Sequence, residues 1–193
     1  MKVIGITGGI ATGKSEVAKI IKKFGIPVFD SDASVHKIYQ NGIGVKYLKD
    51  LCPGAIDGNK IDRKKLSELI ANRQNLLKQI ESVIHPLVRQ AENEFLFETR
   101  TAKHKVAVID SPLLIETGHY KDMDVTILID TTPEIQHSRA MLRPGMTEEK
   151  LKMIMSKQMS SAEKRKHSNY IVENNGTLAD LENQIRKIFM ELV

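Results

Sequence analysis

The sequence predicts a doubly wound α/β domain on a five-stranded parallel sheet, with a helical insertion and a lid. Short apolar segments rich in β-branched residues recur along the chain, as expected for buried parallel strands. Longer segments with the apolar period of a helix separate them. A glycine-rich turn joins the first expected strand to the first expected helix, so the chain opens as a strand–helix–strand unit.

The five expected strands are short and apolar with little polar alternation, which is typical of strands buried on both faces. They span KVIGIT (2–7), PVF (27–29), KVAVID (105–110), DVTILID (124–130) and YIV (170–172). Start and stop signals mark the helices between them. The first helix should run from Lys14 to a stop at Gly25, and later helices should start at Asp62, Thr132, Ser160 and Thr177.

The segment between the second and third strands is mostly helical. DGNKIDR (57–63) should form a turn, and an apolar-periodic stretch then runs from Leu66 to Phe97. His85-Pro86 interrupts this stretch. The proline should end or kink the helix there, because it lacks an amide hydrogen and crowds the preceding turn.

The composition excludes several classes of protein. The 193 residues are 41% hydrophobic with a net charge of +5, and the single Cys52 cannot form an internal disulfide. A cytoplasmic location is therefore the default expectation, and no segment approaches the roughly 20 apolar residues of a membrane span. Basic residues form short clusters without interleaved aromatics, so we expect a small phosphorylated ligand and no nucleic-acid or membrane partner. The sequence does not define the oligomeric state, and a monomer is the default expectation.

The segment GGIATGKS (8–15) matches the phosphate-loop pattern G-x-x-x-x-G-K-[ST]. It lies where a strand ends and a helix begins, and this context argues against a chance match in a glycine-rich turn. Lys14 should reach the β- and γ-phosphates of a nucleotide, and the Ser15 hydroxyl should bind Mg²⁺. The expected nucleotide-binding residues are Gly8, Gly9, Ile10, Ala11, Thr12, Gly13, Lys14, Ser15 and Glu16.

The chain lacks the L-S-G-G-Q signature of transporter ATPases and is short for a motor ATPase, which favours a small kinase. Asp30 and Asp32 follow the second strand, at the sheet edge where α/β proteins bind ligands. One of them could accept a proton from a substrate hydroxyl, or the segment could simply form an Asx turn or helix cap. We expect Asp30 to be structural and Asp32 to be the base.

Two further features fit phosphoryl transfer. Asp110 ends the third strand, where a carboxylate could orient Mg²⁺ through water; a strand-end turn is the alternative. Arg139 and Arg143 are four residues apart after the fourth strand, so they should share a helical face. Pro144-Gly145 follows, as a mobile lid would require. Arginines closing over ATP would stabilise the transferred charge, whereas a solvated helix face is the alternative.

With these residues in place, the chain closely resembles the dephospho-coenzyme A kinase family over essentially its full length. The resemblance is carried by GITGGIATGKSEVA (5–18), FGIPVFDSDASVH (24–36), DGNKIDRKKL (57–66), IHPLV (84–88), DSPLLIE (110–116), QHSRAMLR (136–143) and YIVENNGT (170–177). It implies a P-loop kinase fold of the nucleotide-kinase type that uses ATP and Mg²⁺. The implied reaction transfers the γ-phosphoryl group to the ribose 3′-hydroxyl of dephospho-CoA, giving CoA and ADP in the last step of coenzyme A synthesis.

The resemblance also implies residue roles. Asp32 matches the second acid of the family's D-x-D and takes the role of general base, while Arg139 and Arg143 match lid arginines. Motifs that line the acceptor side contain His85, Leu113 and Glu116. For His85, a helix-breaking packing role is the alternative.

The resemblance further implies a division of one P-loop kinase domain, 1–193. Its parts are a nucleotide-binding core (1–32, 105–135 and 169–193), a helical CoA-binding insertion (33–104) and a lid (136–168). The chain departs from the family's usual loop at Ala11, Thr12 and Glu16. Ala11 stands where the family has glycine, so this position must keep φ below zero or accept strain.

Two other functions fit a phosphate-loop domain of this size. A nucleoside monophosphate or small-metabolite kinase would share the architecture, but IHPLV (84–88) and DSPLLIE (110–116) argue against it. A non-catalytic regulator could use ATP to switch a partner surface. Asp32 and the two lid arginines argue against a regulator, because a pure switch needs no acceptor base.

Overall fold

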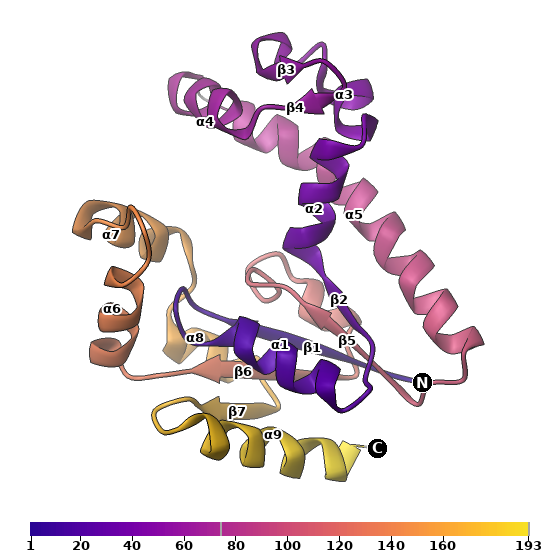
Figure 1. The fold of residues 1–193 in the computed structure, drawn as a ribbon, viewed down its shortest axis with the longest axis vertical. Coiled ribbons are helices and arrows are strands. Elements are labelled where there is room, and N and C mark those ends of the chain that lie inside the picture. Colours follow the sequence, from indigo (N-terminus) through magenta and orange to yellow (C-terminus); the bar gives the residue numbers. More distant parts are fainter. Residues whose placement is uncertain (74, 193) are drawn as a thin grey trace. The chain divides into compact units, whose positions relative to one another are not determined.

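The computed structural model describes residues 1–73 and 75–192 and divides into two compact units (Figure 1). The first, the sheet unit, comprises Met1–Phe29 and Thr99–Val193. The second, the helical unit, comprises Asp30–Glu98. Within the described part of the chain, no helix combines the length and apolar character needed to cross a membrane.

The five expected strands form one sheet, which confirms the predicted fold class. In chain order they are β1 (Lys2–Gly8), β2 (Val28–Asp30), β5 (Val106–Asp110), β6 (Val125–Asp130) and β7 (Tyr170–Glu173). Their order across the sheet is β2-β5-β1-β6-β7. The central strand β1 pairs in parallel with β5 and β6, and β6 pairs in parallel with β7. This order places the loop after β1 between the ends of β5 and β6.

Two helices cover one face of the sheet. The helices α1 (Lys14–Lys23) and α9 (Leu178–Leu192) pack together (Figure 1), and their apolar faces join the buried side chains of alternate strand residues such as Ile4 and Ile6. Gly5 faces the other side because side chains alternate along a strand. There a β-carbon would come within 2.4 Å of Leu114 and 2.9 Å of Met123. Both sheet faces are therefore buried, which explains the unbroken apolar strands.

The expected lid region forms three helices within the sheet unit: α6 (Pro133–Met141), α7 (Glu148–Lys157) and α8 (Ser161–Lys166). The predicted cap at Thr132 is present, because its hydroxyl accepts from the amide of Ile135 at 3.4 Å. The predicted cap at Ser160 likewise accepts from the amide of Glu163 at 3.2 Å. A short 3₁₀ helix, η2 (His119–Asp122), lies between β5 and β6.

The helical unit has its own apolar core. Its elements are α2 (Ser31–Gln40), α3 (Ile43–Leu48), η1 (Pro53–Ala55), β3 (Ile56–Asp57), β4 (Lys60–Ile61), α4 (Arg63–Asn72) and α5 (Leu76–Thr101) up to Glu98. The expected turn is the tip of an antiparallel β3–β4 hairpin. Asp62 caps α4 as predicted, accepting from the amides of Lys64 and Lys65 at 2.9 and 3.1 Å.

The proline in the long apolar stretch does not end its helix. Pro86 lies inside the continuous helix α5, so of the two expected effects the end of the helix is wrong, and the kink stays a prediction. A proline in a helix interior costs about 3 kcal/mol. Packing outweighs this cost, because Leu76, Ile80 and Ile84 on the same helix are buried in the core of the helical unit.

Candidate functional site

The turn between β1 and α1 has the backbone geometry of an anion-binding loop. Two of its residues, Ala11 and Gly13, have positive φ values of 60° and 99°. The first hydrogen bond of α1 runs from the amide of Glu16 to the carbonyl of Gly13 at 2.9 Å. The amides of Lys14 and Ser15 thus precede the helical ladder. They lie at the positive end of the helix, where phosphate binds favourably.

Ala11 resolves the question raised by the sequence. Its φ of 60° places it in the left-handed region, so the chain accepts strain where glycine would have none. For a residue with a β-carbon, this conformation costs about 1–2 kcal/mol. Contacts that hold the loop must supply that free energy.

Two glycines of the loop are required by close packing. A β-carbon at Gly8 would come within 2.6 Å of the Thr12 hydroxyl and 2.7 Å of the Ile129 carbonyl. At Gly13 it would lie 2.1 Å from the side-chain nitrogen of Asn174. That nitrogen donates to the Thr12 carbonyl at 2.8 Å, so the close approach is itself a support of the loop.

The Lys14 side chain is held by Asp110, the strand-end carboxylate that was expected to orient Mg²⁺. The ammonium group donates to Asp110 Oδ1, and both side chains are largely buried, with 15% and 4% of their surface exposed. Strand register explains the meeting, because Ile6 of β1 lies opposite Asp110 of β5. The loop lysine and the strand-end aspartate therefore share one edge of the sheet.

The residues expected to hold magnesium fit a nucleotide-bound ion. Among the described residues, no group of three or more His, Cys, Asp or Glu side chains could hold a metal by itself. Magnesium on a nucleotide needs only one or two protein oxygens, because phosphates and waters supply the other ligands. Ser15 is exposed in the first turn of α1 and Asp110 ends the neighbouring strand, so this donor set suits such an ion.

The two expected lid arginines lie in different structural settings. Arg139 is on α6 and donates to the backbone carbonyl of Asn174 at 3.0 Å. Arg143 is exposed and lies beyond the last residue of α6, so the two do not share a helical face as expected. The residue before a proline is sterically disfavoured from the helical conformation, and Arg143 precedes Pro144.

The aspartates after β2 also separate into two settings. Asp30 caps α2, accepting from the amide of Ala33 at 2.9 Å, which confirms its expected structural role. Asp32 is exposed in the first turn of α2. His85 is exposed on α5 of the same helical unit. Leu113 is in the sheet unit, with 39% of its surface exposed.

Glu116 has an internal partner that the sequence does not reveal. Its Oε1 atom accepts from the ammonium group of Lys164 at 2.9 Å and from the amide of Met159 at 3.0 Å. Lys164 is only 1% exposed and also donates to the Pro112 carbonyl at 3.2 Å. Glu116 thus fixes α8 and the segment before it against the chain that follows β5.

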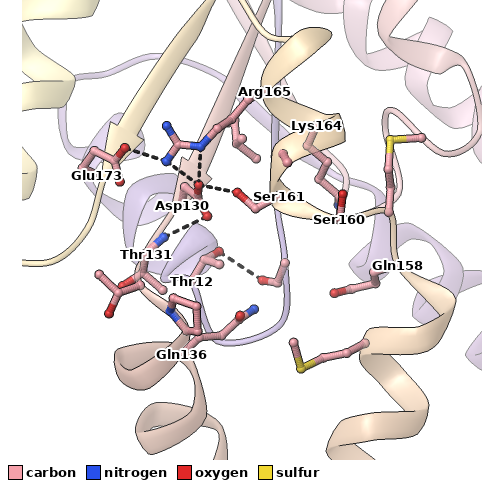
Figure 2. A pocket seen from close by; sticks show the side chains of 17 residues that line it. Thr12, Asp130, Thr131, Gln136, Gln158, Ser160, Ser161, Lys164, Arg165 and Glu173 are labelled. Atoms are coloured by element: carbon pink, nitrogen blue, oxygen red, sulfur yellow. Dashed lines mark hydrogen bonds and ion pairs between the residues drawn. The ribbon is translucent and has the colours of Figure 1, made fainter.

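A cavity of about 570 Å³ lies beside the phosphate loop (Figure 2). One wall is a polar network in which Asp130 accepts from Arg165 Nε at 2.8 Å and from the Ser161 hydroxyl. Arg165 also donates to Glu173 at 2.6 Å. The hydrogen bonds that Arg165 donates to Glu173 and Asp130 raise the pKa of its guanidinium, which keeps it charged. These bonds join α8 to β6 and β7.

Three amide side chains that support the loop were not assigned from the sequence. Asn174 bonds the carbonyl of Thr12, while Gln136 and Gln158 bond the backbone of Ile10. Gln136 and Asn174 lie in motifs that carry the family resemblance, but neither motif states a role for them. Their partners are 126 to 162 residues distant in the chain, so spacing offered no signal.

Comparisons with known proteins point to one family. A family model described as dephospho-CoA kinase matches residues 2–180. A dephospho-CoA kinase from Rhodopseudomonas palustris is 40% identical over 188 residues, which cover 97% of this chain and 94% of that protein.

Solved structures show the same likeness. The structure of TT1252 from Thermus thermophilus matches with a TM-score of 0.83 and 33% identity, covering 100% of this chain and 98% of that one. A dephospho-CoA kinase from Campylobacter jejuni matches with a TM-score of 0.73 and 26% identity, covering 98% of this chain and 96% of that one.

Proposed function

We propose a division of catalytic roles for this chain, which belongs to the dephospho-CoA kinase family and is an ATP-dependent kinase of dephospho-CoA. The finer proposal is that the γ-phosphoryl group passes to the ribose 3′-hydroxyl, giving CoA and ADP. The observation that carries the proposal is the phosphate loop at the start of α1, with Lys14 paired to Asp110.

Lys14 is proposed to bind the β- and γ-phosphates of ATP. In that role its ammonium group would exchange Asp110 for phosphate oxygens, and Asp110 would help to hold Mg²⁺ through a water. Ser15 would hold the same ion through its hydroxyl. Magnesium, when bound, neutralises charge on the β- and γ-phosphates.

Asp32 is proposed as the general base on the acceptor side. It takes the proton from the ribose 3′-hydroxyl as that oxygen bonds to the γ-phosphorus and the bond to the β-phosphate oxygen breaks. ADP leaves with the electron pair. The exposed position of Asp32 in the first turn of α2 supports this role, because a base must be reachable by substrate.

The remaining site residues are proposed to position the reactants. Arg139 and Arg143 would stabilise the charge that spreads over the transferred group. His85 and Leu113 would line the acceptor site. Glu116 would contribute to acceptor binding by fixing α8, given its bond to Lys164. We place the reaction in the cytoplasm and take the monomer as the working state.

The test is release of ADP from ATP and Mg²⁺, with and without dephospho-CoA, with AMP and adenosine as alternative acceptors. Turnover that requires dephospho-CoA, with CoA identified by mass, is the expected result. Turnover with AMP or adenosine, and none with dephospho-CoA, would instead indicate a kinase of a nucleoside or nucleotide. ATP binding without turnover on any acceptor would instead favour a regulator.

A further inference from the structure

The backbone of Ile10, near the tip of the phosphate loop, is bonded on both sides by lid side chains. Gln136 of α6 donates from Nε2 to the Ile10 carbonyl at 2.8 Å. Gln158, which follows α7, accepts from the Ile10 amide through Oε1 at 3.0 Å. Figure 2 shows the two side-chain amides pointing toward each other from opposite sides. The two glutamines thus form a clamp on one residue of the loop.

Apolar packing joins the same parts of the molecule. Ile10 and Ala11 are 8% and 6% exposed and belong to one buried cluster with Ala140 of α6 and Leu151 of α7. Gly9 leaves room for the clamp, since a β-carbon there would lie 2.9 Å from Gln136 Nε2. The tip of the phosphate loop is therefore part of the core of the lid.

The clamp is next to the strained residue of the loop. Ala11 directly follows Ile10 and has a φ of 60°, which is unfavourable for a residue with a β-carbon. We propose that Gln136 and Gln158 are positioning residues that hold Ile10 and Ala11 in the conformation that binds ATP. These two side chains then set the affinity for ATP through the loop, without contacting the phosphates themselves. This inference rests on the proposed binding of ATP by the loop.

The opposite chemical roles of the two glutamines give a matched test. Gln136→Glu replaces a donor with an acceptor that faces the Ile10 carbonyl, whereas Gln158→Glu keeps an acceptor for the Ile10 amide. Both variants add one negative charge beside the same residue. By titration calorimetry with ATP and Mg²⁺, we expect Gln136→Glu to raise the Kd about tenfold and Gln158→Glu to change it less than about threefold.

A variant at Gln158 that removes the acceptor should weaken ATP binding, unlike Gln158→Glu, which keeps it. Gln158→Leu leaves the Ile10 amide without its partner, so we expect the Kd for ATP to rise about tenfold. At saturating ATP, kcat and the KM for dephospho-CoA should stay near those of the unmodified chain. A lid that merely lost its structure would instead change all three parameters together. Equal losses in Gln136→Glu and Gln158→Glu would overturn the clamp, because charge alone predicts equality.

The link to Ala11 has its own test. Glycine needs no support at positive φ. The rise in the Kd for ATP caused by Gln136→Ala should therefore shrink to less than about threefold in an Ala11→Gly background. The same loss in both backgrounds would refute a role in holding Ala11. Binding of ATP is measured without acceptor, so these results stand apart from the substrate assignment. Unmodified protein that binds ATP yet leaves dephospho-CoA unchanged would refute only the proposed function.

Discussion

Lys14 and Asp110 form an ion pair between the end of the phosphate loop and the end of β5. Parallel register sets this relationship, because Ile6 and Asp110 lie opposite each other in adjacent strands. The pair keeps the loop lysine ordered, with 15% of its side chain exposed. The position of the lysine side chain is thus set by the sheet as well as by the loop.

Replacing Lys14 with alanine should damage both ATP binding and phosphoryl transfer, since its proposed role is to bind the phosphates in the ground state and at transfer. We expect kcat/KM for ATP to fall by about 10²-fold or more, because a charged hydrogen bond is lost. Steady-state kinetics and calorimetry separate the two effects. Retained activity would contradict the assignment of the phosphate loop.

Asp32→Asn should bind ATP normally and lose turnover by about 10²–10⁴-fold, because asparagine cannot accept the proton of the acceptor hydroxyl. Asp30→Ala is the matched control within the same segment. Its loss removes the cap of α2 and should cost about 1 kcal/mol of stability, with turnover largely kept. Near-normal turnover in Asp32→Asn would remove Asp32 from the mechanism.

The two arginines should give different kinetic signatures. Arg139→Ala removes the bond to the Asn174 carbonyl and should raise the KM for ATP as well as lower kcat, since Asn174 supports Thr12 of the loop. Arg143→Ala should mainly lower kcat, because we propose that Arg143, which is exposed in this structure, acts at transfer. The comparison needs kcat and KM for each variant. A change in KM alone for Arg143→Ala would mean that it serves ground-state binding only.

Gly13→Ala should abolish nucleotide binding. The added β-carbon would meet the Asn174 side chain at 2.1 Å, at a residue with a φ of 99°. Ala11→Gly, in contrast, should change stability by no more than about 1 kcal/mol, because relief of strain offsets the greater freedom of the unfolded chain. Thermal unfolding and ATP titration of both variants test the contrast. Normal binding by Gly13→Ala would show that the loop is not closely packed there.

The start of α9 provides a prediction about pH. The Thr177 hydroxyl and amide donate to Asp180 and lower the pKa of its carboxyl group. A lowered folded-state pKa adds stability above the unfolded pKa of about 3.9, and this contribution is lost as the pH falls through the folded value. The melting temperature of the unmodified chain should therefore exceed that of the Asp180→Asn variant at pH 7, and the difference should shrink below about pH 4. A difference that grows in acid would contradict this.

The sequence allowed the strands, the phosphate loop and most helix starts to be predicted, because each depends on neighbouring residues. Buried strands need apolar runs, and caps need a hydroxyl or carboxylate at a fixed offset. The strands β3 and β4 were missed because two residues each give no period to detect. The path of α5 through Pro86 was also missed, since buried packing decides it.

The candidate site was predictable where a motif states a role and unpredictable where distant segments meet. Lys14, Ser15 and Asp110 were assigned from their places at strand and helix ends, and the structure pairs Lys14 with Asp110. The clamp on Ile10 was not, because its two glutamines are 126 and 148 residues further along the chain. Arg143 lies beyond the end of α6 because it precedes Pro144, which disfavours the helical conformation at that position.

The burial of Ile10 and Ala11 among lid residues has a consequence for protein engineering. A chimera that takes residues 133–158 from a relative would also need matching side chains at positions 10 and 11. Otherwise the foreign helices would meet a loop tip shaped for other neighbours. We expect such exchanges to succeed only when the loop tip and the transplanted helices come from the same parent, so that the two segments are inherited as one unit.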